Sequence, residues 1–292
     1  MTTQAQQLSA ALSGTVTLGG ELTVNRLGFG AMRITGEGIW GPPNDKKQAL
    51  AVLRRAVELG VNFIDTADSY GPNVSEELIA EALHPYPKDL VIATKGGWNR
   101  PGPNQWTHDS SPAHLRKAVE GSLKRLRLDR IDVYQLHAPD PAVPFKASVE
   151  VLAELQHEGK IRFAALSNVA REHIEKARKI VPIVSVQNRY SMADREWEHV
   201  LSYCDEHQIA FIPWFPLGAG KLSSEALGRV AKAHQCTPMQ VALAWLLQRS
   251  PVMLPIPGTS SLLHLEENIA AAGLKLTKPE FDELDQAGMQ DA

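Results

Sequence analysis

Cysteine is scarce in this chain of 292 residues, and metal-binding patterns are missing. The two cysteines, Cys204 and Cys236, lie far apart and fit no metal-ligand spacing. Thiols without a disulfide framework are typical of a reducing compartment. The sequence has no His-x-His, HExxH or CxxC pattern, and His108 and His114 flank a Ser/Pro loop without an obvious third ligand. We therefore expect no metal site.

Long apolar runs and an excess of charge of one sign are missing as well. No run approaches the ~20 residues that a transmembrane helix needs. The N-terminal residues lack the basic and apolar regions of a secretory signal. A net charge of −3 gives no electrostatic reason to expect nucleic acid or an anionic membrane as a partner. These features predict a cytoplasmic protein that binds neither nucleic acid nor a membrane.

What the sequence does contain is a regular alternation of short apolar runs and amphipathic segments from Leu27 onward. Before it, Thr15–Leu18 and Leu22–Val24 flank Gly19-Gly20 and predict a β-hairpin. After the first unit at Leu27, strands are expected over 61–65, 90–95, 132–137, 161–167, 183–187, 209–214 and 252–256. Helices are expected over 45–59, 74–83, 112–126, 146–158, 171–180, 194–207, 238–248 and 262–272, with one more around 279–287.

These eight strand–helix pairs follow one another without a composition break or a linker. They predict an α/β fold of the (β/α)8 TIM-barrel type, with residues 13–292 as a single domain after a disordered tail over residues 1–12. A doubly wound open sheet is the rival architecture. Its dinucleotide fingerprint is matched poorly by Gly28-x-Gly30-x-x-Arg33, because the third small residue is missing and a long loop follows.

Polar residues stand at the ends of the predicted strands. The C-terminal ends of all strands in a parallel barrel meet at one face. Six strands in turn end on a residue suited to binding or chemistry, namely Asp65, Lys95, His137, Ser167-Asn168, Gln187-Asn188 and Trp214. Taken singly, each has an ordinary structural explanation, such as a helix cap for Asn168 or a core histidine for His137. Their joint placement predicts a functional site at this face.

Tyr70 follows Asp65 on the loop after its strand, and the pair suggests acid chemistry. A tyrosine with the usual pKa of about 10 is a poor acid at neutral pH, but a nearby cation lowers that pKa. Lys95 held by Asp65 would make Tyr70 a general acid for a carbonyl that becomes an alkoxide. His137 would donate a hydrogen bond to the carbonyl oxygen. None of these groups supplies a hydride, so such a reductase needs a nicotinamide cofactor.

The chain resembles the aldo-keto reductases over essentially its whole length. The resemblance rests on Asp65-Thr66-Ala67 with Tyr70-Gly71, on Thr94-Lys95 and on Leu136-His137. Further matches are residues 159–162 with 167–168, 187–190, 216–218, and 256–261 with 267–268. It implies reduction of aldehydes or ketones with NADPH, or alternatively NADH. It also implies a catalytic tetrad of Asp65, Tyr70, Lys95 and His137.

For the cofactor, the resemblance implies that Ser167, Asn168 and Gln187 hold the nicotinamide carboxamide. Trp214 would stack on the ring, with Phe215 as the alternative. The adenosine end is expected at residues 257–261, because a helix N-terminus with free N–H groups and hydroxyls binds phosphate; an ordinary serine-capped helix is the other explanation. The remaining expected cofactor residues are Leu217, Lys221, Gly258, Thr259, Ser260, His264, Glu267 and Asn268.

Two departures from the family pattern concern this adenosine end. Gly258 and His264 stand where many aldo-keto reductases carry a lysine and an arginine that bind the 2′-phosphate of NADPH. Their absence weakens the case for NADPH over NADH. The segment from Leu217 to Ser224 is also shorter than the loop that covers the pyrophosphate in many members, and Lys221 is its only cation.

On the substrate side, Trp40, Trp98 and Trp106 lie on Gly/Pro/Asn-rich segments and are expected to offer aromatic faces to a planar or apolar substrate. A packing role is the alternative for each. Residues 38–43, 82–86 and 215–218 resemble a subgroup that includes pyridoxal reductases, which makes pyridoxal a candidate substrate.

Two other functions compete with the reductase. One is a cofactor-binding regulatory subunit, similar to the channel β-subunits that resemble this family. The other is a lyase or aldolase with Lys95 as a Schiff base, which would leave Ser167, Asn168 and Gln187 unexplained. The expected partners are a small carbonyl substrate and, at most, further copies of this chain, as a monomer or weak homo-oligomer.

Overall fold

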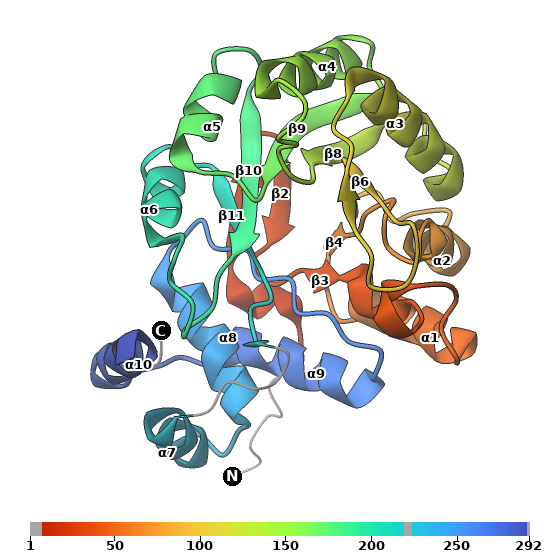
Figure 1. The fold of residues 1–292 in the computed structure, drawn as a ribbon. Coiled ribbons are helices and arrows are strands. Elements are labelled where there is room, and N and C mark those ends of the chain that lie inside the picture. The colour runs from red at the N-terminus through yellow and green to blue at the C-terminus, as the bar shows by residue number, and fades with distance from the viewer. Residues whose placement is uncertain (1–7, 219–223, 291–292) are drawn as a thin grey trace.

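The computed structural model describes residues 8–218 and 224–290 of the chain. Its main sheet contains seven strands that pair in parallel in the order β11-β10-β9-β8-β5-β4-β3. The strands are β3 (Phe29–Gly30), β4 (Phe63–Asp65), β5 (Val91–Gly96), β8 (Ile131–Leu136), β9 (Ile161–Ser167), β10 (Ile183–Arg189) and β11 (Ala210–Trp214). The sheet curls into a barrel surrounded by helices (Figure 1). The predicted (β/α)8 class is confirmed.

The eighth barrel position is filled by residues 252–256, which form no regular strand. The amide of Phe211 donates to the carbonyl of Val252 at 2.9 Å, and the amide of Leu254 donates back to Phe211 at 2.8 Å. On the other side, the amide of Gly28 donates to the carbonyl of Pro255 at 2.9 Å. Because Pro255 has no N–H group, it cannot continue a ladder of strand hydrogen bonds. These three bonds close the barrel between β11 and β3.

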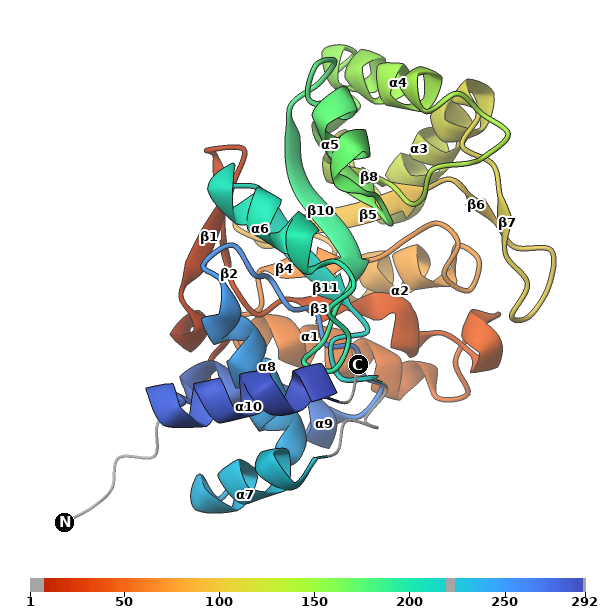
Figure 2. The same ribbon diagram turned by 60° about the vertical axis from the view of Figure 1, so that its left-hand side comes forward.

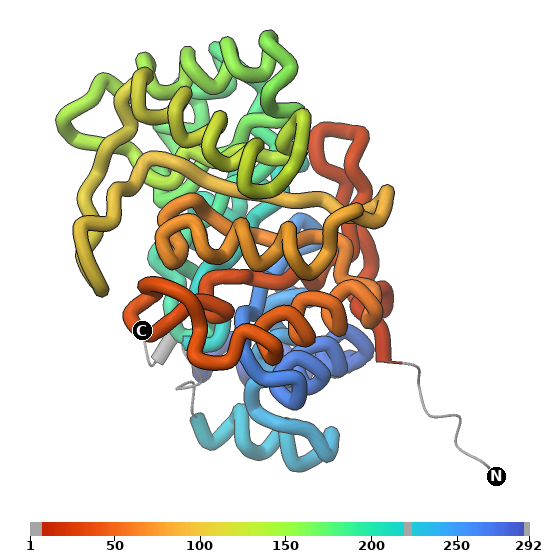
Figure 3. Tube along the Cα trace, turned by 90° about the vertical axis from the view of Figure 1, so that its right-hand side faces the viewer, coloured from red at the N-terminus to blue at the C-terminus, as the bar shows by residue number. Residues whose placement is uncertain are grey.

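The predicted hairpin is present as β1 (Thr15–Leu18) and β2 (Leu22–Asn25), which pair antiparallel. Leu18 and Val24 pack into the same apolar cluster as Val133 and Phe163 of the barrel strands. The hairpin therefore covers the N-terminal end of the barrel. Figure 3 shows it, in red, at the opposite end of the molecule from the yellow segment that follows β5.

Ten α-helices are described. They are α1 (Lys46–Glu58), α2 (Val74–Leu83), α3 (Pro112–Leu126), α4 (Phe145–His157), α5 (Arg171–Ala177), α6 (Glu198–Glu206), α7 (Glu225–Ala233), α8 (Pro238–Arg249), α9 (Leu262–Ala270) and α10 (Lys278–Gln290). Several begin at side-chain caps, including Asp45, Ser111 and Thr237. The tail helix expected near residues 279–287 is confirmed by α10. No helix among the described residues is long and apolar enough to cross a membrane.

Besides the strand expected over residues 252–256, three expectations from the sequence were wrong. Helix α7 was not predicted, although Ser224 caps it by accepting from the amide of Leu227 at 3.1 Å. Helix α6 begins at Glu198 rather than at residue 194, because residues 191–194 form a turn closed by backbone hydrogen bonds. Residues 10–13 form the 3-10 helix η1 with Ala10 buried, so the predicted disordered tail does not extend through residues 10–12. Residues 1–7 lie outside the described part.

The barrel interior changes from apolar to polar along the strands. One buried apolar cluster contains Phe63, Ala93, Val133, Ala165 and Ile212. Two positions further along the same strands stand Asp65, Lys95, Gln135, Ser167 and Trp214. Side chains two apart on a strand point the same way, so these residues form the next inward layer, toward the C-terminal ends. The hydrophobic core thus leads directly into a polar layer at the face where the sequence predicts a site.

Strand β10 departs from this alternation. Its register against β9 shifts between Ile183 and Val186. Val184 belongs to the interior apolar cluster, and the side chain of Gln187, three positions later, contacts Asp65 inside the barrel. The shift changes which face the following residues occupy. It is what turns Gln187 inward.

Candidate active site

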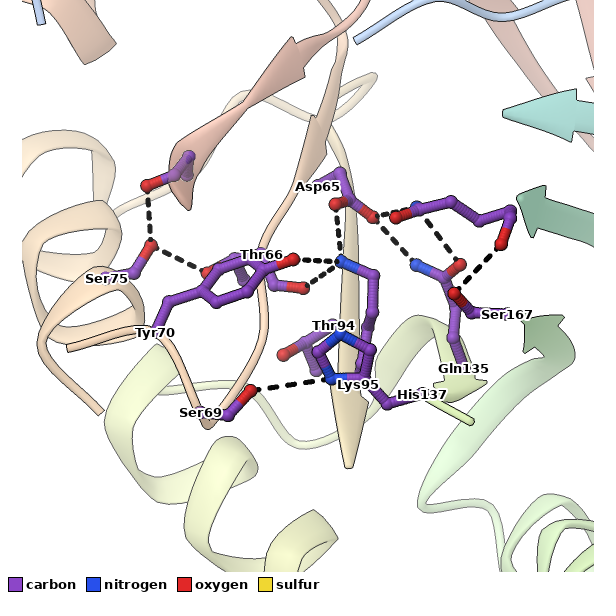
Figure 4. Close-up of polar contacts among 12 residues, drawn as sticks. Asp65, Thr66, Ser69, Tyr70, Ser75, Thr94, Lys95, Gln135, His137 and Ser167 are labelled. Atoms are coloured by element: carbon purple, nitrogen blue, oxygen red, sulfur yellow. Dashed lines mark hydrogen bonds and ion pairs between the residues drawn. The ribbon is translucent and has the colours of Figure 1, made fainter. Parts of the chain in front are cut away.

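Lys95 lies at the centre of the polar layer. Its side chain is fully buried, and its Nζ donates to Asp65 Oδ1 at 2.5 Å, to the carbonyl of Thr66 at 2.9 Å and to Tyr70 Oη at 3.2 Å (Figure 4). The three side chains come from β5, β4 and the loop after β4. Because the ammonium group donates to the phenol oxygen, the hydroxyl hydrogen of Tyr70 is left to point elsewhere.

The pKa of Tyr70 shifts in the direction opposite to the one expected from the sequence. Burial raises this pKa above the usual value, and the Lys95 ammonium opposes the rise without cancelling it. For Lys95, burial lowers the pKa, but Asp65 and Tyr70 together raise it beyond its usual value. Near neutral pH both groups therefore keep their protons. Tyr70 is a neutral donor held beside a fixed cation.

Asp65 is fully engaged by hydrogen-bond donors. Its second oxygen, Oδ2, accepts from Gln135 Nε2 and from Gln187 Nε2, each at 2.8 Å. Such bonds to a carboxylate are stronger than those between neutral groups. The sequence analysis did not identify Gln135 as a site residue. The signal that could have found it is an amide side chain at an inward position of the otherwise apolar strand β8. Gln187, expected at the cofactor, has its Nε2 directed at Asp65.

His137 lies against Tyr70. The two rings meet edge to face with centroids 5.9 Å apart, and His137 Nδ1 is 3.4 Å from Ser69 Oγ. Burial, together with the charge of Lys95, lowers the pKa of His137 well below its usual value, so the ring is neutral. In the tautomer in which Ser69 donates to Nδ1, the ring hydrogen resides on Nε2, which is then the donor.

The side chains expected to hold the nicotinamide are linked to one another. Asn168 Nδ2 donates to the carbonyl of His137 and Trp214 Nε1 donates to Asn168 Oδ1, both at 2.9 Å. Ser167 Oγ donates to the carbonyl of Gln187 at 2.9 Å. The ends of β8, β9, β10 and β11 are thereby tied together. Phe215 contacts the Trp214 ring at 6.3 Å, and Leu217 is partly buried against the core.

The turn at Gly258 explains one departure from the family pattern. A Cβ on Gly258 would collide with the carbonyl oxygen of Gly30, and a Cβ on Gly30 would lie 2.6 Å from the carbonyl of Ile256. The two backbones pass so closely that neither position has room for a side chain. The missing lysine at 258 is therefore a consequence of how this barrel closes.

The residues after Gly258 open helix α9. Thr259 Oγ1 accepts from the amide of Ser261 at 3.0 Å, and Ser261 Oγ accepts from the amide of His264 at 3.4 Å. Both hydroxyls are used as caps. Ser260 and His264 are exposed, Glu267 is half-buried and Asn268 is buried. Lys221 lies outside the described residues.

Replacing Gly258 by alanine should lower stability. Overpacking a tight contact typically costs about 1–3 kcal/mol, and the atom in the way here belongs to the backbone. Thermal unfolding of Gly258→Ala should show a lower Tm than that of the wild type. Gly228→Ala, in α7 with open space around the position, is the matched control and should raise Tm, because alanine favours helix. An unchanged Tm for Gly258→Ala would contradict the close approach.

Asp68 is a buried carboxyl beside this site that was not singled out in the sequence. Within the described residues its Oδ1 has no hydrogen-bond partner. Burial, and then the charge of Glu76, raises the pKa of Asp68 well above its usual value. Nearby, the buried Glu76 accepts from Thr94 Oγ1 and pairs with Arg125, each at 2.6 Å. Of the two buried carboxyl groups, Asp68 is therefore the one with an unpaired oxygen, and its surroundings favour the protonated form.

Asp68 should make stability depend on pH. A folded-state pKa above the unfolded value of about 3.9 means that the folded state binds the proton more tightly. The stability from this proton is present at low pH and lost as pH rises through the folded pKa. Asp68→Asn should therefore raise Tm over the wild type more at pH 8 than at pH 5. Exposed Asp89→Asn is the control, and an equal effect of Asp68→Asn at both pH values would refute the assignment.

The three tryptophans expected on the substrate side surround this polar layer. Trp98 on β6 (Trp98–Asn99) packs edge-on against Trp106 with centroids 6.0 Å apart and lies 3.9 Å from the ring of His108 on β7 (Thr107–His108). Trp98 and Trp106 also approach the His137 ring, at 6.3 and 6.5 Å. Trp40 forms a bridge to Gly71. Each of the three tryptophans is half-buried. Together Trp40, Trp98 and Trp106 form an aromatic wall beside Tyr70 and His137.

The family model described as Aldo/keto reductase family matches residues 26–288 of the chain. The chain belongs to the aldo/keto reductase family. Among its relatives is an uncharacterized oxidoreductase of Schizosaccharomyces pombe, 50% identical over 289 residues that cover 98% of this chain and 94% of the relative. Another is pyridoxine 4-dehydrogenase of Escherichia coli, 48% identical over 281 residues that cover 94% of this chain and 98% of the relative.

A solved structure supports the same grouping for this aldo/keto reductase. An aldo/keto reductase from Klebsiella pneumoniae, in complex with NADP and acetate, superimposes with a TM-score of 0.79 at 28% identity. The similarity covers 93% of this chain and 94% of that one. Membership implies carbonyl reduction with a nicotinamide cofactor. Within the described residues, no three His, Cys, Asp or Glu side chains cluster as metal ligands.

Proposed function

We propose that residues 13–292 act as one catalytic domain that reduces aldehydes to alcohols with NADPH, and that pyridoxal or a similar aromatic aldehyde is a substrate. The observation that carries the proposal is the hydrogen bond from Lys95 Nζ to Tyr70 Oη, with Lys95 held by Asp65. A fully buried cation that donates to a phenol leaves the phenol hydrogen for a substrate oxygen.

A nicotinamide cofactor bound here would supply the hydride for the carbonyl carbon. Tyr70 gives its proton to the carbonyl oxygen as the C=O bond becomes a C–O single bond, and Lys95 stabilises the phenolate that remains. Neutral His137 donates from Nε2 to the same oxygen and orients it. Asp65, with Gln135 and Gln187, keeps Lys95 charged and in place. The phenolate regains a proton from solvent after the alcohol leaves.

The residues at the C-terminal face fit a dinucleotide. Gly258 is exposed, packs against the backbone of Gly30 and carries no side chain, so its backbone is accessible near the N-terminus of α9. Asn168, Ser167 and the remaining Oε1 of Gln187 are proposed to contact the carboxamide, and Trp214 to stack on the ring. Complexes of family members with NADP support NADPH.

The choice of substrate is supported by the aromatic wall and by one relative. Trp98 and Trp106 offer ring faces and edges within 6.5 Å of the His137 ring, which suits a planar aldehyde. The relative named pyridoxine 4-dehydrogenase is 48% identical over 281 residues. Pyridoxal is the aldehyde formed when pyridoxine is oxidised at its position 4.

The proposal is tested by titrating the purified protein with NADPH and separately with NADH while tryptophan fluorescence is followed, and then adding aldehydes. Saturable quenching that is lost in Trp214→Phe is expected, followed by turnover of pyridoxal. Turnover of other aldehydes but not of pyridoxal would reject the substrate and keep the reductase. Binding without any turnover would favour a regulatory role, and no binding of either nucleotide would refute the proposal.

A further inference from the structure

Arg100 joins three separate loops at the mouth of the site. It lies between β6 and β7 with 9% of its surface exposed. Its Nε donates to the carbonyl of Gln105 at 2.9 Å, its Nη1 to the carbonyl of Ser69 at 2.9 Å and its Nη2 to the carbonyl of Gly38 at 3.0 Å. The rigid guanidinium fork therefore fixes the relative positions of three backbone segments.

Each of these carbonyls belongs to a segment that carries a site side chain. Ser69 precedes Tyr70, Gln105 precedes Trp106, and Gly38 stands two residues before Trp40. Figure 2 shows the β6–β7 hairpin projecting from the barrel on the side away from β1 and β2. A hairpin in this position needs an anchor to keep its tryptophans near the catalytic groups, and Arg100 provides one.

The guanidinium also stacks on the aromatic wall. Its Cζ lies 3.7 Å from the centre of the Trp106 ring and 5.7 Å from that of Trp40. Such cation–π contacts strengthen when the cation is shielded from water. Arg100 thus holds Trp106 through its ring as well as through the neighbouring carbonyl of Gln105.

Within the described residues Arg100 takes part in no ion pair, and burial lowers its pKa without an opposing carboxylate. The three carbonyls and the two rings therefore set its position. A lysine would keep the positive charge, but an ammonium on a flexible stem cannot reproduce the planar fork.

We propose that Arg100 is a positioning residue. It holds two tryptophans of the aromatic wall, Trp40 and Trp106, at a fixed distance from Tyr70 and thereby determines affinity for aromatic aldehydes. The inference rests on the proposed reductase function. Tyr70 is independently bonded to Lys95, so loss of the fork should disturb the binding of a ring more than transfer of the proton. This predicts a change in KM that exceeds the change in kcat.

The test is Arg100→Lys, measured in two ways. With saturating NADPH, KM for an aromatic aldehyde should rise roughly 10-fold or more, while KM for a small aliphatic aldehyde and kcat for both should change less than about 3-fold. In hydrogen exchange without substrate, amides of residues 36–41, 66–71 and 97–109 should exchange faster together. If Arg100→Lys does not fold, Arg100→Gln is measured in the same way.

Arg162→Lys is the matched control. Arg162 also pairs with a residue distant in sequence, Glu21 at 2.7 Å, and stacks on Phe163 at 5.6 Å, but it lies near the start of β9 at the other end of the barrel. It should change neither measurement at the three loops. Faster exchange in only one loop, or equal KM changes for aromatic and aliphatic aldehydes, would overturn the inference. Because exchange needs no turnover, this outcome is distinguishable from failure of the proposed function.

Discussion

Replacing Tyr70 by phenylalanine is expected to lower kcat for aldehyde reduction about 10²- to 10⁴-fold, the usual contribution of a positioned general acid. The change removes one oxygen and its proton. Lys95 Nζ loses one of three acceptors and keeps Asp65 and the carbonyl of Thr66. The ring itself keeps its contact with His137. The measurement is single-turnover reduction at saturating NADPH.

Binding of the cofactor is the control for this variant. The dissociation constant for NADPH, followed by tryptophan fluorescence, should stay within about 3-fold of the wild-type value, because no expected cofactor residue changes. Tyr134→Phe is a matched variant, since Tyr134 is a fully buried tyrosine on β8 outside the proposed tetrad. It should retain most of the activity. Strong residual turnover by Tyr70→Phe would reject Tyr70 as the acid.

Replacing Lys95 by methionine is expected to have the second largest effect, seen in the pH profile of alcohol oxidation. In that direction Tyr70 must accept a proton, so the phenolate is the active form. Burial raises the pKa of Tyr70 and Lys95 opposes the rise. Removing Lys95 leaves the rise unopposed, so the oxidation profile should move to higher pH. At a fixed pH below the pKa of Tyr70, the phenolate fraction and the rate fall about tenfold for each further pH unit by which that pKa rises.

The same substitution should lower stability, because Asp65 would be left buried without its cation. Removing one partner of a buried ion pair typically costs about 3–5 kcal/mol. The double variant Asp65→Asn with Lys95→Met removes the uncompensated charge and should recover part of the lost Tm, while its pH profile stays displaced. A profile for Lys95→Met that coincides with that of the wild type would show that Lys95 does not tune Tyr70.

Much of the fold was predictable because it is written in local patterns. The bounds of α2 and α3 agree with the expected ranges, since apolar periodicity marks both helices and Ser111 caps the start of α3. Helix α7 was not predicted, although its serine cap is visible in the sequence. The expected strand over residues 252–256 lacks regular pairing, in part because Pro255 has no amide hydrogen. A cap or a proline can be identified in the sequence, but whether a helix or a strand forms there also depends on the neighbouring segments.

The sequence by itself determined the alternation of strands and helices, and with it the face to which Asp65, Lys95 and His137 are brought. Only the tertiary structure decided the rest. The register shift in β10 turns Gln187 toward Asp65, and the approach of Gly30 to Gly258 leaves no room for a side chain. The pKa of Tyr70 rises because burial outweighs the charge of Lys95. These outcomes depend on distances between segments remote in sequence, and periodicity and spacing do not encode such distances.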